Sequence, residues 1–362
     1  MKRLNGMSHS GVRAGLVSRK SVSGETVRTT VPLSLHSHFG RTEIVEAGIK
    51  TIERIQREVK TLVRNDPHGA FEPATIGLRA KPLLPVDLVM EKNAGIELHQ
   101  RLGSGRVMVI GEESLRNQDL DLSAETRMVV LVDMIDGTDL LQRGLSNWCS
   151  AMVFYDCQCT EIVAAFVGLP DEGIYFATKD DLWPFVYRYG SSAPVPVAGP
   201  SCIRTLADSA IGYYGQKVGA FCSVARHREL IGFLETLELE CATQGKSLKT
   251  RIYNFAGNPM AIRMIDGISD SRIDAILELN GQAPHDIVSG AFIAQKAGAI
   301  FCNLEGGSVD LNHLLQRPAD PKSRIRYILA ATEDLSREIR GCLSGLHRGL
   351  DRHAPLGYCG LT

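Results

Sequence analysis

The sequence predicts an α+β protein, because helical and strand-like hydrophobic patterns both occur without strict alternation. One long segment, 42–62, carries apolar residues at helical spacing. Three strand-like segments, 150–155, 161–168 and 173–178, follow one another with only short turns between them. Such a succession is typical of an antiparallel meander. A fold built only from alternating strands and helices is therefore not expected.

The first helix is predicted from the spacing of Ile49, Ile52, Ile55 and Val59. These residues fall on one face of a helix with 3.6 residues per turn. The segment "NDPHG", which begins at Asn65, contains residues that stop a helix. An amphipathic helix is therefore expected from Thr42 to about this point.

The remaining elements follow the same rules of periodicity and turn chemistry. Before the meander, we expect a helix at 93–102 and strands at 106–110 and 127–132. Between 180 and 249 the pattern is weak, apart from a helix at 228–239. After it we expect, in order, a helix at 258–266, a strand at 272–279, a helix at 286–298, a strand at 326–332 and a helix at 333–347.

The chain divides into four predicted parts, which are a flexible leader (1–41), an N-terminal half (42–195), a C-terminal half (196–348) and a tail (349–362). The segment "GSSAPVPVAGPS" supports a boundary between the halves because it is rich in Pro, Gly and Ser. The leader is rich in Ser, Thr and Arg and has a single acid, Glu25. A flexible tail is favoured, and an organelle transit peptide is the alternative.

Composition excludes several classes of function. The chain has 362 residues, is 44% hydrophobic and 22% charged, and has a formal charge of −1. This balance provides no global field for nucleic acid or an anionic membrane. No apolar segment reaches the length of a membrane span, and no secretory signal is present, so a cytoplasmic protein is expected. The nine cysteines form no C-x-x-C pair, so reduced packing residues are favoured over a structural zinc site.

Acidic residues gather where predicted strands end. Glu112 and Glu113 follow one strand, and Asp133 and Asp136 follow the next. Asp286 begins a helix with an apolar face. Taken singly, the aspartates could cap helices and the glutamates could be solvated charges. Together they could form one acidic pocket, in which close carboxylates need a cation, and oxygen ligands select Mg²⁺ or Mn²⁺.

The order of these motifs resembles the inositol monophosphatase superfamily of lithium-sensitive, magnesium-dependent phosphatases. The signature of that family, D-P-(I/L)-D-G-(T/S), is similar to "DMIDGT" from Asp133, which "GEES" precedes and "HDIVSGAFIAQKAGA" follows downstream. The likeness extends from about Thr42 to the final helix. It implies a layered α-β-α-β-α sandwich of the inositol monophosphatase or sugar phosphatase type, and a possible homodimer.

The resemblance also implies roles for individual residues. Glu112 would bind Mg²⁺ and help to hold the attacking water, and Asp133 would bridge two metal ions. The backbone carbonyl of Ile135 would be a further ligand, and Asp136 and Asp286 would complete the second metal site. Thr138 would orient the water together with Glu112.

Substrate contacts are implied at further positions. Gly137 lets the backbone approach a phosphate closely. Gly137 and Thr138 also begin a segment whose free backbone N–H groups suit an anion. Glu278 would bind substrate hydroxyls. Gly257 and Asn258 would line the same pocket, although Asn258 followed by Pro259 also fits a helix start. Lys81 would approach the phosphate or the water, or is a surface lysine.

Several positions depart from the family pattern. Met134 replaces a proline, His285 stands where tryptophan is common, and Leu140 stands where inositol phosphatases tend to have asparagine. Ala299 replaces the second glycine of a closing pair. In "PVDLVMEKN", Met90 and Asn93 stand where relatives carry a threonine and an aspartate near a third metal ion, so either two or three ions are expected.

The expected function is a Mg²⁺-dependent phosphomonoesterase that uses a metal-activated water on a small phosphorylated polyol, with inositol monophosphate favoured. The alternatives within the superfamily are fructose-1,6-bisphosphatase and 3'-phosphoadenosine 5'-phosphate phosphatase. The alternative outside enzymes is a catalytically retired homologue that binds or regulates. No nucleic acid or membrane partner is expected.

Overall fold

The computed structural model describes eight ranges of the chain: 40–72, 84–112, 126–215, 218–245, 247–255, 257–267, 272–316 and 324–344. The predicted tail, Lys81 and Glu113 lie outside these ranges. The leader was predicted to extend to residue 41, but Arg41 is already the first residue of a helix. Residues 1–39 lie outside the described part of the chain.

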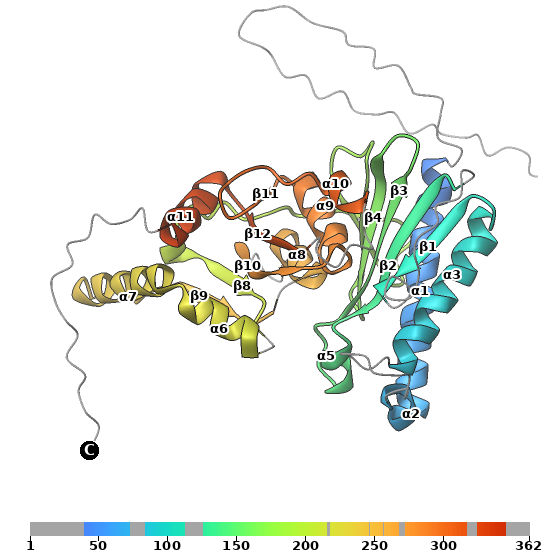
Figure 1. Cartoon of the computed structure of the whole chain (residues 1–362), viewed down its shortest axis with the longest axis horizontal. Helices are drawn as coiled ribbons and strands as arrows, with labels where there is room; N and C mark the ends of the chain where they lie inside the picture. The colour runs from blue at the N-terminus through green and yellow to red at the C-terminus, as the bar shows by residue number, and fades with distance from the viewer. Residues whose placement is uncertain are drawn as a thin grey trace, which may run out of the picture. The chain divides into compact units, whose positions relative to one another are not determined.

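The described residues between 40 and 344 form five layers, in the order helix, sheet, helix, sheet, helix (Figure 1). Three hydrophobic cores separate the layers. An outer core joins the first helices to the larger sheet, a middle core joins that sheet to two central helices and the smaller sheet, and a third core joins the smaller sheet to the last helices. The α+β class and the layered sandwich are therefore confirmed.

The larger sheet contains seven strands in the order of the sequence. They are β1 (Val107–Gly111), β2 (Met128–Asp136), β3 (Cys149–Asp156), β4 (Glu161–Leu169), β5 (Gly173–Thr178), β6 (Phe185–Arg188) and β7 (Val195–Pro196). From β2 to β7 every neighbouring pair is antiparallel, which confirms the predicted meander. Only β1 and β2 are parallel, so both of these strands end at the same edge of the sheet.

The outer helices are α1 (Arg41–Asn65), α2 (Pro67–Phe71) and α3 (Pro85–Leu102). The predicted face of α1 is buried against the larger sheet, with Ile52, Ile55 and Val59 inaccessible to solvent. Helix α3 begins eight residues before the predicted position 93. The proline at its first position has no N–H to lose there, so Pro85 starts the helix rather than preventing it.

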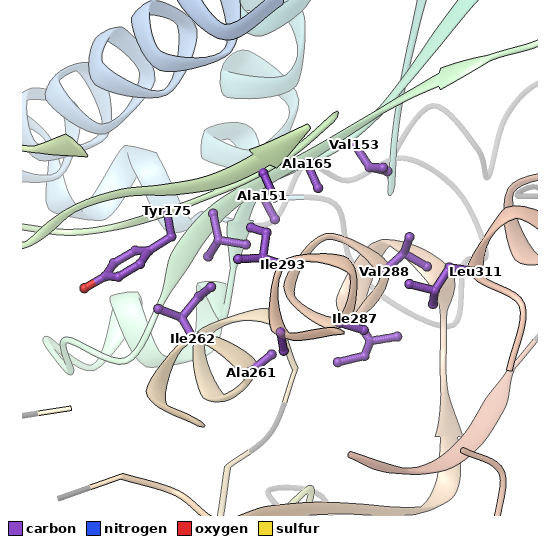
Figure 2. Packing of buried hydrophobic residues seen from close by; sticks show 14 of the residues in the cluster. Ala151, Val153, Ala165, Tyr175, Ala261, Ile262, Ile287, Val288, Ile293 and Leu311 are labelled. Atoms are coloured by element: carbon purple, nitrogen blue, oxygen red, sulfur yellow. The ribbon is translucent and has the colours of Figure 1, made fainter. Parts of the chain in front are cut away.

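The middle layer consists of α8 (Asn258–Ile265) and α9 (Val288–Lys296). In Figure 2, Ile293 of α9 lies beside the small side chain of Ala151 on the larger sheet, and Ile262 of α8 belongs to the same core. Because side chains alternate along a strand, β2 serves two cores. Val129 and Leu131 join the middle core, whereas Val130, Val132, Met134 and Ile135 join the outer core.

The smaller sheet has five strands in the order β11-β12-β10-β8-β9. Their bounds are Ala210–Tyr213 for β8, Arg251–Tyr253 for β9, Ala275–Gln282 for β10, Ile300–Cys302 for β11 and Ile325–Ala330 for β12. The flanking elements are α6 (Val218–Arg226), α7 (Arg228–Thr243), α10 (Leu311–Leu315), α11 (Glu333–Leu343) and the 3-10 turns η1 (Leu206–Asp208) and η2 (Pro284–Asp286). Helix α5 (Thr138–Gln142) follows β2 in the larger half.

The structure corrects several predicted boundaries. Strand β2 extends four residues past Val132 to Asp136. Strand β10 is shifted toward Gln282, and α9 begins at Val288 rather than at Asp286. Helix α11 ends at Leu343. The weakly patterned region contains β6, β7, β8 and α6, none of which was predicted, because short or amphipathic elements at an edge carry little periodicity.

The predicted division of the chain at 195/196 stays a prediction, although the larger sheet ends at Pro196 and the smaller sheet begins at Ala210. Among the described residues, no helix combines the length and the apolar character that crossing a membrane requires.

Candidate metal centre

Two parallel strands deliver the first pair of acidic residues. In the register of β1 and β2, Gly111 lies opposite Val132. The next residues along the two strands are Glu112 and Asp133, so the two carboxylates emerge side by side at one edge of the sheet. This neighbourhood was predicted from the strand ends. Glu112 stays partly accessible, with 22% of its side chain exposed, whereas Asp133 is 8% exposed.

A pairing irregularity lets the second aspartate of β2 reach the same face. Strict alternation would place Asp133 and Asp136 on opposite faces of the strand. Between them the register with β3 shifts, and both Met134 and Ile135 pack into the outer core. The Ser150 hydroxyl donates to the Met134 carbonyl at 2.8 Å within this irregular segment. Because of this shift, the Asp136 side chain lies on the same face of β2 as Asp133, which is the face toward the middle layer.

The turn η2 brings Asp286 to the same place from the smaller sheet. Oxygen atoms of Asp133, Asp136 and Asp286 all lie within 4.8 Å of one another. A second group, formed by Glu112, Asp133 and His285, satisfies the same limit. Asp133 belongs to both groups. Residues from three distant parts of the chain therefore gather around one carboxylate.

The cluster carries a strong electrostatic cost. Burial, followed by the charges of Asp136 and Glu112, raises the pKa of Asp133 well above its usual value. Burial and the charge of Asp286 raise the pKa of Asp136 in the same way. Within the described ranges, no Arg or Lys forms an ion pair with these three aspartates.

A divalent cation fits this donor set, because it would neutralise carboxylates that are otherwise disfavoured in their charged form. The oxygens are hard ligands of the kind that Mg²⁺ and Mn²⁺ take. The geometry therefore provides what the sequence motifs required, while the role of each residue as a ligand stays a prediction.

Asn258 ties the cluster together. Its amide Nδ2 donates to Asp136 Oδ2 at 3.1 Å and to the His285 carbonyl at 2.8 Å. Its Oδ1 accepts the Gly290 N–H at 2.8 Å, and its side chain is fully buried. Asn258 is also the first residue of α8. The residue thus starts a helix and positions the acidic residues, and its predicted contact with substrate stays a prediction.

Gly257 allows this close approach. Its φ is 85°, and a Cβ there would lie 3.0 Å from the Asp286 carbonyl and 3.3 Å from Asp136 Oδ2. A side chain would therefore be strained and would push α8 away from the carboxylates. The absence of a side chain at Gly257 therefore lets α8 approach Asp136, and the predicted role of Gly257 in lining a substrate pocket stays a prediction.

Thr138 lies at the point where β2 turns into α5. Its hydroxyl is 2.9 Å from Asp87 Oδ1 and 2.9 Å from the Ile135 carbonyl, and its single proton can go to either acceptor. Gly137 before it has φ 98°, which a glycine adopts without strain. Helix α5 has only five residues, so its dipole adds little to anion binding.

Glu278 is held inside the smaller sheet rather than at an open surface. Its side chain is fully buried, and its Oε1 accepts the N–H groups of Asn280 at 2.6 Å and Gly281 at 2.8 Å. Its Oε2 is buried and has no hydrogen-bond partner among the described residues. Burial raises the pKa of Glu278 to about 7. The side chain shapes the turn that leads to η2, and the predicted contact with substrate hydroxyls stays a prediction.

The positions linked to a third metal ion have other contacts. Met90 is buried in the outer core. The Asn93 amide donates to Glu58 Oε2 of α1 at 2.7 Å. Between them, Glu91 lies against the end of β1, since a Cβ added to Gly111 would be 2.0 Å from Glu91 Oε2. A carboxylate that was not predicted therefore stands beside the strand that carries Glu112.

Sequence reasoning missed Asp87, Glu91 and the involvement of His285. Asp87 lies in the first turn of α3, where an acidic residue is common for reasons of the helix dipole alone. Nothing in the local pattern distinguished Glu91 from a solvated charge. His285 was noticed as a departure from the family pattern, and its position directly before Asp286 was the available signal.

No family model and no curated protein matches the chain. Solved structures do. An IMPase of Thermotoga maritima has a TM-score of 0.56 and 12% identity, with 85% of this chain and 100% of that chain covered. The extragenic suppressor protein SuhB of Bartonella henselae has a TM-score of 0.56 and 16% identity, with coverages of 83% and 97%.

A third structure, inositol monophosphatase II of Staphylococcus aureus, has a TM-score of 0.54 and 19% identity, with 85% of this chain and 96% of that chain covered. Identities this low establish a shared fold and leave activity open. In all three cases nearly the whole length of the solved chain is matched. The protein therefore has the inositol monophosphatase fold, as the order of its motifs predicted.

Proposed function

We propose that the protein is a Mg²⁺-dependent phosphomonoesterase of the inositol monophosphatase superfamily. The favoured substrate is a small phosphorylated polyol, with inositol monophosphate first among the candidates. Fructose 1,6-bisphosphate and 3'-phosphoadenosine 5'-phosphate are the alternatives.

One observation carries the proposal. Oxygens of Asp133, Asp136 and Asp286 converge within 4.8 Å, although the first two lie on β2 of the larger sheet and Asp286 lies in η2, after β10 of the smaller sheet. A cluster of this kind, with raised pKa values at Asp133 and Asp136, is costly unless a cation binds there. A purely structural role would not require β2 and η2 to bring three carboxylates together at that cost. Similarity of fold adds to this argument and does not replace it.

Different residues of the chain would have different roles in hydrolysis. Bound Mg²⁺ would neutralise the phosphate, activate the attacking water and stabilise the leaving oxygen. Glu112 lies at the accessible side of the cluster, where its carboxylate can accept a proton from a water. If Thr138 donates its proton to Asp87, the Thr138 oxygen is free to accept a hydrogen bond from the same water. Both groups are fixed by β1 and by the turn after β2.

The titles of similar structures support a phosphate substrate but do not narrow it to one compound. One structure of this fold is bound to inositol monophosphate, one to 2'AMP, and one to NADP and Ca²⁺. Within this chain, Leu140 and Asn93 differ from the pattern expected of inositol phosphatases. The class of substrate therefore has to be determined by comparing turnover of several phosphate esters.

The test is phosphate release from inositol 1-phosphate, fructose 1,6-bisphosphate and 3'-phosphoadenosine 5'-phosphate, with and without Mg²⁺ and Li⁺. We expect Mg²⁺-dependent release from at least one of them and inhibition by Li⁺. Asp133→Asn is expected to lose nearly all turnover while remaining folded. An Asp133→Asn protein with full Mg²⁺-dependent activity would contradict the assignment.

A catalytically retired homologue is the second candidate, because His285 and Asn93 replace residues of the family pattern. Against it, Glu112, Asp133, Asp136 and Asp286 are all retained. No phosphate release from any substrate, together with no binding of a divalent cation, would favour this candidate. Cation binding without turnover on the three compounds would instead move the search to other phosphate esters.

A further inference from the structure

His285 faces the carboxylate cluster through a ring nitrogen. Its Nε2 lies 3.4 Å from Asp286 Oδ1 and 3.9 Å from Glu112 Oε2. A ring nitrogen also falls within 4.8 Å of the oxygens of both Glu112 and Asp133. The side chain is 12% exposed, so the ring is a fixed part of the site rather than a mobile surface group.

We propose that His285 supplies a nitrogen ligand to the metal ion held by Glu112 and Asp133, and that this ligand favours a transition metal such as Mn²⁺ over Mg²⁺. The inference rests on the metal centre of the proposed function. It goes beyond that function because the family motif provides only oxygen donors, and tryptophan, which is common at this position, cannot bind a metal ion.

The distances agree with shared coordination. With ligand bonds of about 2.1 Å, donors around an octahedral ion are about 3.0 Å apart when adjacent and about 4.2 Å apart when opposite. The separations of Nε2 from Asp286 and Glu112 lie inside this range. Small side-chain rotations are enough to place all these donors around one ion.

Buried contacts fix the backbone of η2, which carries the ring. The His285 carbonyl accepts a hydrogen bond from the Asn258 amide at 2.8 Å. Pro284 and Ile287, on either side of His285 and Asp286, are buried. The backbone at His285 is therefore anchored, and the low exposure of the ring limits its rotation. The same amide also contacts Asp136, so the histidine and the carboxylates are positioned by one residue.

An alternative role for His285 is a hydrogen bond from Nε2–H to Asp286. A cation among the carboxylates would favour an Nε2 atom without a proton, because the cation binds the nitrogen lone pair and repels a proton there. The His285 Nδ1 atom is buried and has no hydrogen-bond partner among the described residues. No contact in that part of the chain therefore locks the ring as an Nε2–H donor.

Metal choice follows from the donor type. Mg²⁺ prefers oxygen ligands and loses its waters reluctantly. Imidazole suits transition metals, whose affinities for a given site rise from Mn²⁺ to Cu²⁺ along the first row. One nitrogen among several carboxylates should therefore raise the affinity for Mn²⁺ relative to Mg²⁺.

The test uses the full chain loaded with Mn²⁺ and pulsed electron paramagnetic resonance, which detects nitrogen bound directly to Mn²⁺. We expect a histidine nitrogen coupling that changes on ¹⁵N-histidine labelling. His285→Phe should abolish the coupling, and the control His313→Phe, at an exposed position in α10, should retain it. By calorimetric titration, His285→Phe should lower the Mn²⁺ to Mg²⁺ affinity ratio by about tenfold or more.

The outcomes separate this inference from the proposed function. Mn²⁺ binding with no nitrogen coupling in the unaltered protein, or a coupling that persists in His285→Phe, would overturn the role of His285 alone. No binding of either cation would overturn the metal centre itself. His285→Gln, which offers an oxygen in place of the nitrogen, keeps the test decisive if His285→Phe fails to fold. It should bind Mn²⁺ without the coupling.

Discussion

Asn258 of α8 donates a hydrogen bond from Nδ2 to Asp136 Oδ2 at the end of β2, over 3.1 Å. Through this contact, the helix that starts the central layer also fixes a carboxylate of the larger sheet. The same amide reaches the backbone of η2, which carries the residues contributed by the smaller sheet. The geometry of the cluster thus depends on a side chain that touches all three elements.

The first prediction concerns Asn258. Asn258→Ala removes the side-chain hydrogen bonds to Asp136, to the His285 carbonyl and to the Gly290 N–H, while Asp136 keeps the backbone N–H of residue 258 as a donor. We expect a loss of about 2–4 kcal/mol in the free energy of unfolding and weaker Mg²⁺ binding. Urea denaturation and calorimetry measure the two effects.

The matched control for this change is Asn312→Ala. Asn312 Oδ1 accepts the Ile162 N–H at 2.7 Å, and Asn312 is not among the residues that approach the cluster. It should lower stability without changing Mg²⁺ affinity. Equal Mg²⁺ affinity in Asn258→Ala and the unaltered protein would show that Asn258 does not position the carboxylates.

The second prediction concerns stability without metal. Asp133→Asn removes a buried charge that faces Asp136, Glu112 and Asp286. Without metal, we expect the variant to be more stable than the unaltered protein, with a free energy of unfolding that is higher by about 1 kcal/mol or more. In excess Mg²⁺ the order should reverse, since a ligand at 100 times its Kd stabilises by about 2.7 kcal/mol.

Thermal unfolding with EDTA and with Mg²⁺ checks this reversal. Asp171→Asn is a suitable control, because Asp171 forms its ion pair with Lys60 at an exposed position. It should shift both curves equally. If Mg²⁺ stabilised Asp133→Asn as much as the unaltered protein, Asp133 would not be a central ligand.

The third prediction concerns Thr138. Thr138→Val keeps the shape of the side chain and removes the hydroxyl that contacts Asp87. We expect kcat to fall by about a hundredfold, as for the loss of a group that handles a reacting proton, with a smaller change in KM. Steady-state kinetics on the active substrate give both constants.

Thr61→Val is the control for this change, since the Thr61 hydroxyl only donates to the Arg57 carbonyl on the surface of α1. Its kinetics should be unaltered. Asp87→Asn should resemble Thr138→Val if the two residues act as a pair. A normal kcat in both variants would show that the contact is structural only.

The fourth prediction concerns pH. The pKa of Glu278 is about 7 in the folded protein, against an ordinary value of 4.5. The folded state therefore holds the proton more tightly, so this residue's contribution to stability is complete below pH 4.5 and is lost as pH rises toward 7. The loss amounts to about 3 kcal/mol.

Glu278→Gln should remove this part of the pH dependence, because glutamine does not titrate. The difference in unfolding free energy between the variant and the unaltered protein, measured from pH 4.5 to 8 with EDTA, should grow with pH and level off above 7. A difference that stays constant over this range would refute the raised pKa.

Local sequence patterns predicted a large part of the fold. The spacing of Ile52, Ile55 and Val59 was sufficient for α1, because one helical face buries them all. The strands β3, β4 and β5 were equally clear, since short apolar segments joined by short turns are typical of antiparallel strands. Elements such as β9, whose three residues are all exposed, carried no comparable signal.

Candidate site residues were found where side-chain chemistry is unusual for its position. A carboxylate at the end of a buried strand is such a case, and Glu112, Asp133 and Asp136 were identified on that basis together with the motif order. Asp286 was identified at the start of a predicted helix, by its place in the same order of motifs. Asp87 and Glu91 were not, because acidic residues on a helix are ordinary. Their contacts with Thr138 and Gly111 depend on how α3 lies against the larger sheet.

By itself, the sequence determined the class of the fold, the main helices and strands, and the acidic residues that a metal centre would need. Only the tertiary structure decided that Asp133 and Asp136 share a face, that Asn258 joins them to η2, and that His285 stands beside Glu112. The physical reason is that hydrophobic periodicity acts over a few residues along the chain, whereas a site is made by packing between layers that are far apart in sequence.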